Sequence, residues 1–465
     1  MNPKVLLQAI EYIKPWLSFR YQQGDTPGFV VALTHKGKTV FGKAYGEAST
    51  EKHESMTPEH IFRIASHSKS FTATAILQLA EQGKLKIDDF VVQYLPFLQK
   101  HSDSRWQKVT IRQVLSHSAG VIRDGSLADY WQLEGAFPNN EELKKLVLEA
   151  NLIIDANTQM KYSNIGYGIL GLLIETVSGK SYSKFVSDSI IKPLKLANTG
   201  PDITNEIENK LVTGYSRKDT HKNRLPIENI STGALAPATG FYSNAEDLCT
   251  FYRALRVGSG KLLSDESKKE MQRTQWRVHN SLDGEEYGLG LTVEYYGEKR
   301  LWGHSGGFPG QLTMTLYDPE DDLMLVVLTN CLGSDLDAVG YGILSILDYY
   351  KEHDKLGRSS VKFKPFCGRY ISLWGVTDIV HVGAKLLAAY PGWKPFSNPE
   401  ELTFVDNETL KVTKTNGYNS ASELIKFTFD KNNHVESVNF CGSTMLPEKI
   451  WHTKQAGKKI ISIFK

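Results

Sequence analysis

Two groups of strand-like segments lie far apart in this sequence, and together they constrain the fold more than any other feature. The first group, residues 28–49, places β-favouring residues on both sides of a turn at His35–Gly37, which predicts an antiparallel hairpin. The second begins near Tyr287 and ends before a helical stretch over residues 335–350. Mostly helical and loop-like sequence separates them. This order predicts an α+β fold, in which both groups build one antiparallel sheet, flanked by helices, with an inserted helical subdomain.

A further region of short strands follows. Residues 353–361, HDKLGRSSV, are polar and predict a linker. Beyond them, LTFVDNETLKVT and ELIKFTFDKNNHVESVNF alternate apolar and polar residues and contain turn signals, which predicts a small β-barrel over residues 362–465. We therefore expect a first domain of residues 1–352, a linker and a C-terminal barrel.

Composition and charge exclude several classes of partner. Hydrophobic residues make up 41% of the 465 residues and charged residues 23%, as in ordinary globular proteins. The formal net charge of +2 predicts no nucleic-acid partner and no attraction to an anionic membrane. The first 21 residues are amphipathic and lack the apolar core of a signal peptide, and no long apolar run follows. We expect a cytoplasmic protein, or a periplasmic or secreted one if a leader precedes this sequence.

The cysteines predict neither a metal site nor a disulfide framework. Cys249, Cys331, Cys367 and Cys441 are widely spaced and form no Cys-x-x-Cys or Cys/His ligand pattern. Cys367 and Cys441 fall in the same region and could pair in an oxidising compartment, but a packing role is favoured. We expect free thiols and no metal.

A serine and a lysine three residues apart carry the first chemical signal. In FRIASHSKSFTATAILQLAEQ, Ser66 and Lys69 open a predicted helix that runs to Glu81, so one helical turn brings both side chains to the same face. A lysine whose pKa is lowered can take the proton of a serine hydroxyl and make it a nucleophile. The spacing alone is weak evidence, because it recurs at Ser49, Ser181, Ser189, Ser359 and Ser462.

Two later motifs supply further polar groups. Tyr162-Ser163-Asn164 offers a phenol that can relay a proton and an amide that can hold a substrate. Its second copy, Tyr242-Ser243-Asn244, precedes a predicted helix and is interpreted as a helix cap. His304-Ser305-Gly306 lies in a predicted strand, where glycine permits close approach of a substrate backbone. The similar His35-Lys36-Gly37 is interpreted as a hairpin turn.

Taken together and in this order, the three motifs resemble those of the serine β-lactamase and penicillin-binding-protein superfamily, in its class C β-lactamase-like branch of S12-type peptidases. The resemblance extends over roughly residues 5–350, including LSHSAGV at 115–121, which looks like a family segment without direct chemistry. The region from Cys367 is similar to the lipocalin-like barrel that some members carry. The resemblance implies a β-lactamase/transpeptidase-like fold for the first domain.

The resemblance also implies catalytic roles. Ser66 would be the acylated nucleophile and Lys69 its proton partner, and Tyr162 would be the general base and then the acid for the leaving group. Which of Lys69 and Tyr162 takes the first proton stays open. The backbone N–H groups of Ser66 and Gly307 would form the oxyanion hole. No metal and no cofactor would take part.

The substrate-binding residues implied by the resemblance are Asn164, His304, Ser305 and Gly306. His304 stands where many relatives have lysine, and a largely neutral histidine anchors a substrate carboxylate less well. We therefore expect a serine hydrolase that forms an acyl-enzyme on an amide or ester of a small peptide-like substrate, with D-residue selectivity left open. The alternatives are a promiscuous esterase or weak β-lactamase, and a catalytically silent ligand-binding protein. The barrel is a possible site of homo-oligomer formation.

Overall fold

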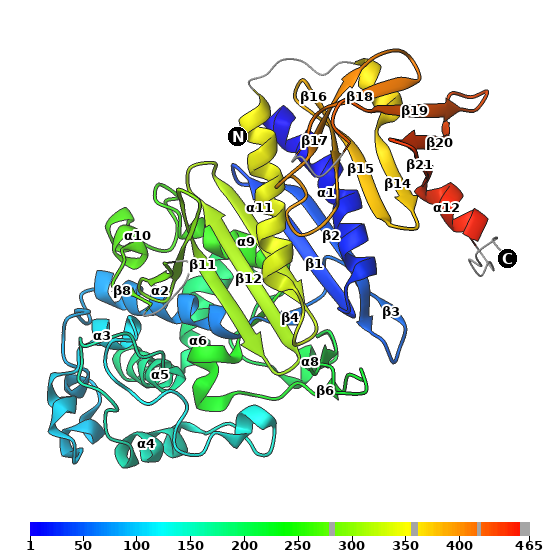
Figure 1. Cartoon of the computed structure of the whole chain (residues 1–465). Coiled ribbons are helices and arrows are strands. Elements are labelled where there is room, and N and C mark those ends of the chain that lie inside the picture. The colour runs from blue at the N-terminus through cyan, green and yellow to red at the C-terminus, as the bar shows by residue number, and fades with distance from the viewer. Residues whose placement is uncertain (279–283, 355–360, 416–419, 456–465) are drawn as a thin grey trace. The chain divides into compact units, whose positions relative to one another are not determined.

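The computed structural model describes residues 1–278, 284–354, 361–415 and 420–455 (Figure 1). By internal contacts the chain divides into two compact units. The larger unit consists of residues 25–336, and the smaller unit combines residues 1–24 with residues 337–465. Each unit therefore has its own core.

The predicted domain limits at residues 352 and 362 stay a prediction. Most of the predicted linker, residues 353–361, lies outside the described part of the chain.

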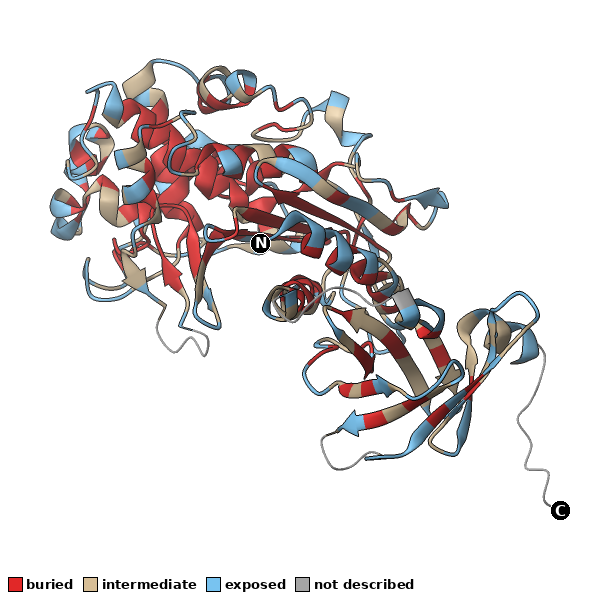
Figure 2. Ribbon diagram, turned by 90° about the horizontal axis from the view of Figure 1, so that it is seen from above, coloured by how far each residue is buried: buried red, intermediate tan, exposed pale blue. Residues whose placement is uncertain are grey.

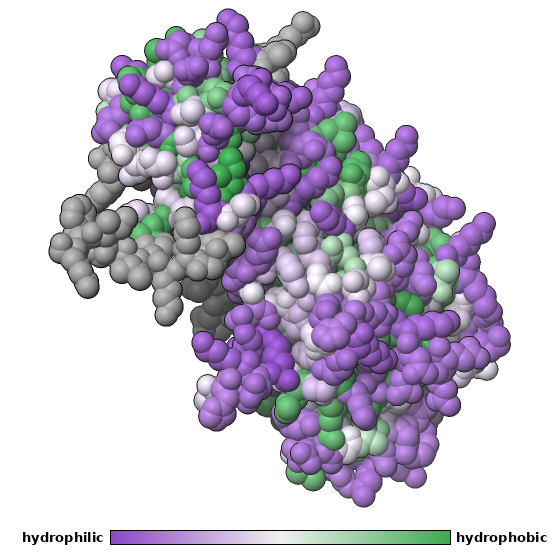
Figure 3. All heavy atoms as spheres, turned by 90° about the vertical axis from the view of Figure 1, so that its right-hand side faces the viewer, coloured by the Kyte–Doolittle hydropathy of each residue, from purple (hydrophilic) through white to green (hydrophobic). Residues whose placement is uncertain are grey.

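No helix among the described residues is long and apolar enough to cross a membrane. Figure 3 shows one face of the molecule, on which hydrophilic residues predominate and hydrophobic ones form small separate patches.

The larger unit is organised around one antiparallel sheet with the strand order β3-β2-β1-β13-β12-β11-β10-β9-β8. Its strands are β1 (Gly28–His35), β2 (Lys38–Ser49), β3 (Glu54–Ser55), β8 (Trp276–Arg277), β9 (Glu286–Tyr287), β10 (Thr292–Tyr296), β11 (Lys299–Phe308), β12 (Gln311–Asp318) and β13 (Leu323–Thr329). Two short pairs lie outside it: β4 (Phe62–Arg63) with β7 (Tyr242–Ser243), and β5 (Gly214–Tyr215) with β6 (Pro226–Ile227).

Strand β1 joins the two distant parts of the sequence. It pairs with β2 on one side and with β13 on the other, where Phe29 lies opposite Thr329 (Figure 1). Every residue of β1 and β13 is buried, as expected for central strands. Lys36 and Gly37 have φ values of 50° and 76°, the left-handed pair that a tight hairpin turn requires. The predicted hairpin and the sheet shared by both parts of the chain are confirmed.

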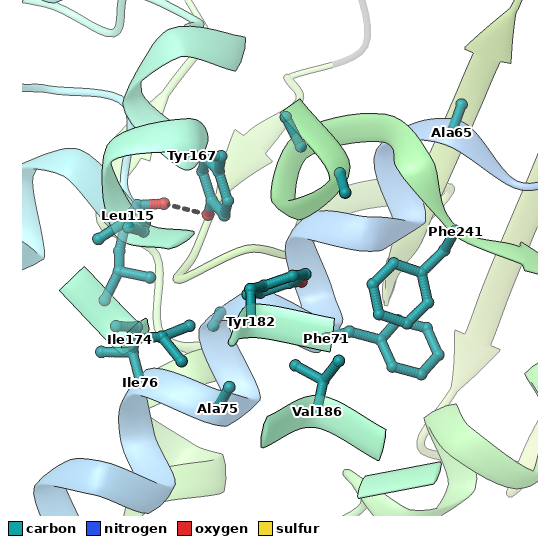
Figure 4. Close-up of a cluster of buried hydrophobic side chains, with 14 of the residues drawn as sticks. Ala65, Phe71, Ala75, Ile76, Leu115, Tyr167, Ile174, Tyr182, Val186 and Phe241 are labelled. Atoms are coloured by element: carbon teal, nitrogen blue, oxygen red, sulfur yellow. Dashed lines mark hydrogen bonds between the residues drawn. The ribbon is translucent and has the colours of Figure 1, made fainter. Parts of the chain in front are cut away.

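The helices of the larger unit are α2 (Ser68–Glu81), α3 (Ile111–Leu115), α4 (Asn140–Glu149), α5 (Asn164–Ser178), α6 (Tyr182–Val186), α7 (Lys192–Leu194), α8 (Asn205–Glu208), α9 (Ala245–Ala254) and α10 (Asp265–Gln272). Buried residues concentrate in its central helices and in the sheet (Figure 2). On α2, the ring of Phe71 stacks on that of Phe241, with centroids 4.3 Å apart (Figure 4). It also stacks on the ring of Phe251, with centroids 3.6 Å apart. Aromatic packing thus fixes α2, the helix that carries Lys69.

The smaller unit contains the predicted barrel, which is closed by strands β14 to β21. Its strands are β14 (Gly368–Ser372), β15 (Gly375–Val382), β16 (Lys385–Ala389), β17 (Glu400–Phe404), β18 (Thr409–Lys414), β19 (Leu424–Phe429), β20 (Val435–Phe440) and β21 (Ser443–Pro447). Buried residues such as Leu386, Leu410, Ile425 and Val438 fill its interior. The α+β fold and the C-terminal barrel are therefore as predicted.

Helices α1 (Pro3–Gln23), α11 (Leu336–His353) and α12 (Glu448–Gln455) complete the description. Within the smaller unit, the buried Trp16 of α1 donates from Nε1 to the carbonyl oxygen of Gly392 at 2.8 Å. The guanidinium of Arg369 donates to both carboxylate oxygens of Asp378, at 2.8 and 2.9 Å. Tyr12 donates to the same carboxylate at 3.2 Å. The first helix thus belongs to the smaller unit and makes hydrogen bonds within it. All four cysteines are free, as predicted.

Candidate active site

Ser66 lies in a short 3₁₀ turn, Ala65–His67, which directly precedes α2. The predicted helix therefore begins two residues later than expected, at Ser68. Ala65 has a φ of 46°, a left-handed value that costs energy for an alanine. The Ser66 side chain is partly exposed, whereas Lys69 is completely buried. This backbone presents the hydroxyl at the surface of a cleft and keeps the amine beneath it.

The structure brings Ser66, Lys69 and Tyr162 together. Lys69 Nζ lies 3.2 Å from Ser66 Oγ, and the phenol of Tyr162 donates to the same Oγ at 2.8 Å. Tyr162 immediately precedes Ser163, whose side chain caps α5 by accepting the N–H of Gly166. The cap fixes where α5 begins and thereby where the phenol stands.

Lys69 has carbonyl oxygens rather than a carboxylate as its close partners. Its Nζ donates to Asn164 Oδ1 and to the carbonyl oxygen of Ala238, each at 2.8 Å. Burial lowers the pKa of Lys69 well below the ordinary lysine value, and the negative charge of Asp124 opposes this only in part. A neutral amine keeps both hydrogen bonds to the carbonyl oxygens and turns its lone pair toward Ser66 Oγ. The site therefore favours a lysine that can accept a proton.

Burial has the opposite consequence for Tyr162. It raises the pKa of the phenol above its ordinary value, so the hydroxyl keeps its proton and donates it in the hydrogen bond to Ser66. The amide of Asn164 is engaged at both ends, since it accepts from Lys69 and donates to Asp124 Oδ1 at 2.7 Å. In this structure Asn164 therefore links an amine to a carboxylate.

The third motif lies on β11. Ser305 and Gly307 are exposed toward a cleft, whereas Gly306 is buried, because successive residues of a strand face opposite sides. A side chain at Gly306 would collide with the carbonyl oxygen of Ile64 and with the Thr313 side chain, so this position requires glycine. Gly306 thus shapes the backbone of the motif.

His304 is buried, and its hydrogen bonds define its tautomer. Nδ1 lies 2.6 Å from the carbonyl oxygen of Ser305, so Nδ1 carries the proton and donates it. Nε2 then accepts from the hydroxyl of Tyr287 at 3.1 Å. Burial, with His67 and Lys69 nearby, lowers the pKa of His304 well below its ordinary value. The ring is neutral and offers no positive charge at this position.

These groups surround a cleft of about 530 Å³. It is lined by Ser66, Arg123, Asp124, Trp131, Met160, Tyr162, Asn164, Glu285, Tyr287, Thr292, His304, Ser305 and Gly307. Sequence reasoning identified the serine, the phenol, the amide and the β11 residues, but it missed Arg123, Asp124 and Tyr287. Asp124 accepts from Asn164, from Trp131 Nε1 and from Arg123 Nε. The segment after LSHSAGV thus supplies an arginine and an aspartate to the cleft.

The other copies of the motifs have structural positions. Asn244 caps α9 by accepting the N–H of Asp247, which confirms the interpretation of the second Tyr-Ser-Asn copy. Ser181 caps α6 in the same way. Among the residues that the structure describes, no group of three or more histidine, cysteine and acidic side chains is arranged to hold a metal ion.

The sequence model of the family named Beta-lactamase matches residues 14–347. The chain belongs to the Beta-lactamase family. "Protein flp" of Staphylococcus aureus (strain COL) is 26% identical over 312 residues, which is 66% of this chain and 60% of that protein. The chain therefore spans about 60% of the length of the first curated relatives that it matches.

Two solved structures share the fold of this chain. The octameric penicillin-binding protein homologue from Pyrococcus abyssi has a TM-score of 0.64 and 22% identity, and the match covers 94% of this chain and 99% of the homologue. The D-amino acid amidase from Ochrobactrum anthropi SV3, complexed with D-phenylalanine, has a TM-score of 0.62 and 23% identity, over 73% of this chain and 97% of the amidase. The chain therefore has the same fold as these two solved structures.

Proposed function

We propose that this protein is a serine hydrolase that forms an acyl-enzyme on Ser66 and cleaves an amide or ester bond of a small peptide-like substrate. The observation that carries the proposal is the convergence of Lys69 Nζ and the Tyr162 hydroxyl on Ser66 Oγ, at 3.2 and 2.8 Å, beside the cleft. A nucleophile with a base and an acid within hydrogen-bonding distance is what acyl transfer requires.

In the proposed reaction Lys69 is the first base. Its neutral amine takes the proton of Ser66, and Oγ attacks the substrate carbonyl carbon. The N–H groups of Ser66 and Gly307 would stabilise the oxyanion. The tetrahedral intermediate collapses as the bond to the leaving group breaks. Tyr162 gives its proton to that group and regains one from the Lys69 ammonium. Water then attacks the acyl-enzyme, releases the acid and returns its second proton to Ser66.

The substrate class follows from the neutral His304. Since neither His304 nor His67 carries a charge, the β11 side of the cleft has no histidine cation to bind a carboxylate; burial lowers the pKa of His67 to about 4. We infer a substrate without a carboxylate at that position, such as an amino-acid amide or an ester. This is a reason to expect weak action on penicillins.

The decisive experiment compares the wild type with Ser66→Ala. Turnover of phenylalanine amide and labelling by a fluorophosphonate are expected to disappear together, with the fold unchanged by circular dichroism. A Ser66→Ala variant that is still labelled and active refutes the proposal. A folded wild type that reacts with none of a broad panel of esters, amides, β-lactams and fluorophosphonates would instead support the silent ligand-binding alternative.

Substrate preference separates the remaining alternatives. The amidase neighbour is described in complex with D-phenylalanine, so we propose D-selectivity and expect a higher kcat/KM for D- than for L-phenylalanine amide. A p-nitrophenyl ester hydrolysed far faster than either amide would indicate an esterase. His304→Lys tests the carboxylate argument: a lysine there should raise the rate of acylation by a penicillin and leave acylation by an ester nearly unchanged.

The barrel unit is proposed to mediate self-association. Trp374 is 94% exposed at the turn between β14 and β15, and its neighbour Leu373 is also exposed. The homologue from Pyrococcus abyssi is described as octameric. We expect an oligomeric mass in light scattering that falls when Trp374 is replaced by serine. A wild type that is monomeric at all concentrations contradicts this part of the proposal.

A further inference from the structure

The segment LSHSAGV at residues 115–121 has no chemistry assigned by the proposed reaction, yet it lies against the site. It begins at the end of α3, where the hydroxyl of Tyr167 donates to the carbonyl oxygen of Leu115 at 2.6 Å (Figure 4). His117 follows, with its side chain 2% exposed and its backbone in the left-handed region at a φ of 59°. An unusual backbone conformation is therefore maintained two residues beyond an anchored carbonyl group.

His117 holds the chain on both sides of Tyr162. Its carbonyl oxygen accepts the N–H of Lys161 at 2.6 Å, and its ring Nδ1 accepts the N–H of Ser163 at 3.1 Å. The imidazole also packs on the phenol ring of Tyr162, with centroids 4.2 Å apart and planes inclined by 36°. One residue thus fixes the backbone before and after the tyrosine, as well as the face of its ring.

The hydrogen bonds require one tautomer of His117. Because Nδ1 accepts, the ring proton lies on Nε2. Nε2 is buried and has no hydrogen-bond partner among the described residues. A buried N–H without a partner is unfavourable, so the position of this ring carries an energetic cost. Burial, together with Lys69, His304 and Arg123 nearby, lowers the pKa of His117 well below its ordinary value and keeps Nδ1 an acceptor.

We propose that His117 is a positioning residue that holds the phenol of Tyr162 within hydrogen-bonding distance of Ser66 Oγ. The inference rests on the proposed function, since it assumes that Tyr162 transfers a proton in the reaction. His117 does not line the cleft and touches no reacting atom. Its effect is on the placement of an acid, and an error of about 1 Å in such a placement can reduce a rate on the order of 10²-fold.

The backbone of His117 permits an informative set of variants. Asparagine tolerates a φ of 59° and can place its Oδ1 near the position of Nδ1, so His117→Asn keeps the acceptor for the Ser163 N–H. His117→Gly keeps the backbone but removes the acceptor and the ring. His117→Gln carries its acceptor one bond further away. We expect kcat to fall about 10²-fold in the glycine and glutamine variants, with KM changed less than about threefold. The asparagine variant should recover at least about tenfold of that loss.

His101 provides a matched control. It is also a buried histidine whose Nδ1 accepts a backbone N–H, that of Asp103 at 2.9 Å, and it does not line the cleft. His101→Gly should lower the melting temperature and leave kcat of the folded protein unchanged. If His117→Gly lowers the melting temperature by a similar amount but keeps its kcat, His117 is merely structural and the inference is wrong.

Each remaining outcome also decides the question. If the glycine variant fails to fold, the asparagine and glutamine variants are compared: equal kcat values overturn the inference, and a higher kcat for asparagine supports it. Ser66→Ala, measured in the same assay, separates the two proposals. An active Ser66→Ala protein refutes the proposed function itself. An inactive Ser66→Ala protein with a fully active His117→Gly refutes only the positioning role.

Discussion

Lys69 in the larger unit and Arg369 in the barrel unit both have basic side chains that are largely shielded from solvent, but their surroundings differ. Lys69 contacts carbonyl oxygens and a hydroxyl, and no carboxylate lies within ion-pair distance of it among the described residues. Arg369 is paired with both oxygens of Asp378. Burial lowers the pKa of each group, but for Arg369 the Asp378 carboxylate more than reverses the effect. The partner, rather than the burial, decides whether a cation can release its proton.

The largest expected effect comes from Lys69→Met, which keeps the length of the side chain and removes the amine. If Lys69 is the first base, kcat/KM should fall about 10⁴-fold, near the upper range for loss of a catalytic base. The free energy of unfolding near pH 7 should stay equal or increase, because burial lowers the pKa of Lys69 and the folded state therefore loses protonation free energy that the unfolded state keeps. Steady-state kinetics and urea unfolding check both parts.

Lys69→Arg is the control for charge. A guanidinium keeps its proton at any ordinary pH, so this variant should be as inactive as Lys69→Met. Substantial activity in Lys69→Arg would show that a positive charge, and not a proton acceptor, is needed at this position.

Removing the arginine of the barrel unit should affect stability alone. Arg369→Met leaves the buried Asp378 carboxylate without its main partner, and breaking such a pair costs about 3–5 kcal/mol of unfolding free energy. The double variant Arg369→Met/Asp378→Leu should recover most of the loss. Urea unfolding measures both, and kcat of the folded protein should not change. A reduced kcat in Arg369→Met would show that Arg369, like Lys69, affects catalysis.

The lowered pKa of Lys69 also predicts how the stability of the protein depends on pH. Because the folded state lowers the pKa of Lys69, the unfolded state binds more protons between that pKa and the ordinary value of about 10.4. Stability linked to Lys69 therefore rises as pH rises through this window, by at most about 1.4 kcal/mol per pH unit. The stability difference between Lys69→Met and the wild type should shrink as the pH rises from about 7 to about 10. A constant difference would mean that Lys69 keeps an ordinary pKa.

The smallest effect is expected from Arg369→Lys. Lysine preserves the charge but cannot form the two parallel hydrogen bonds to Asp378. We expect the free energy of unfolding to fall by about 1–2 kcal/mol, less than for Arg369→Met. A loss as large as that of the methionine variant would show that geometry matters more than charge in this pair.

The parts of the fold that sequence reasoning could predict are those specified by local patterns. A short stretch of residues specifies each of three features: the turn at Lys36-Gly37, the alternation in strands β18 and β19, and the helix after Ser66. The joint position of Ser66, Lys69 and Tyr162 depends on long-range folding, and the resemblance of the three motifs to a known family implied it. Their catalytic roles stay a proposal.

The residues that escaped prediction have no local pattern. Asp124 lies in a loop, and its contact with Asn164 of α5 joins residues 40 positions apart in the sequence. The tautomer of His304 depends on Tyr287, which comes from a neighbouring part of the sheet. The charged pair Arg123-Asp124, one residue beyond LSHSAGV, was an available signal, but the sequence alone does not show that it lines a cleft.

The pairing of β1 with β13 has a consequence for biosynthesis. Phe29 finds its partner Thr329 only when roughly 300 further residues have left the ribosome, which takes about 15 to 60 seconds at ordinary elongation rates. During that interval the edge of β1 that later pairs with β13 has no partner strand. An unpaired apolar edge promotes association between nascent chains. We therefore expect a cotranslational chaperone to bind residues 28–49 of the nascent chain.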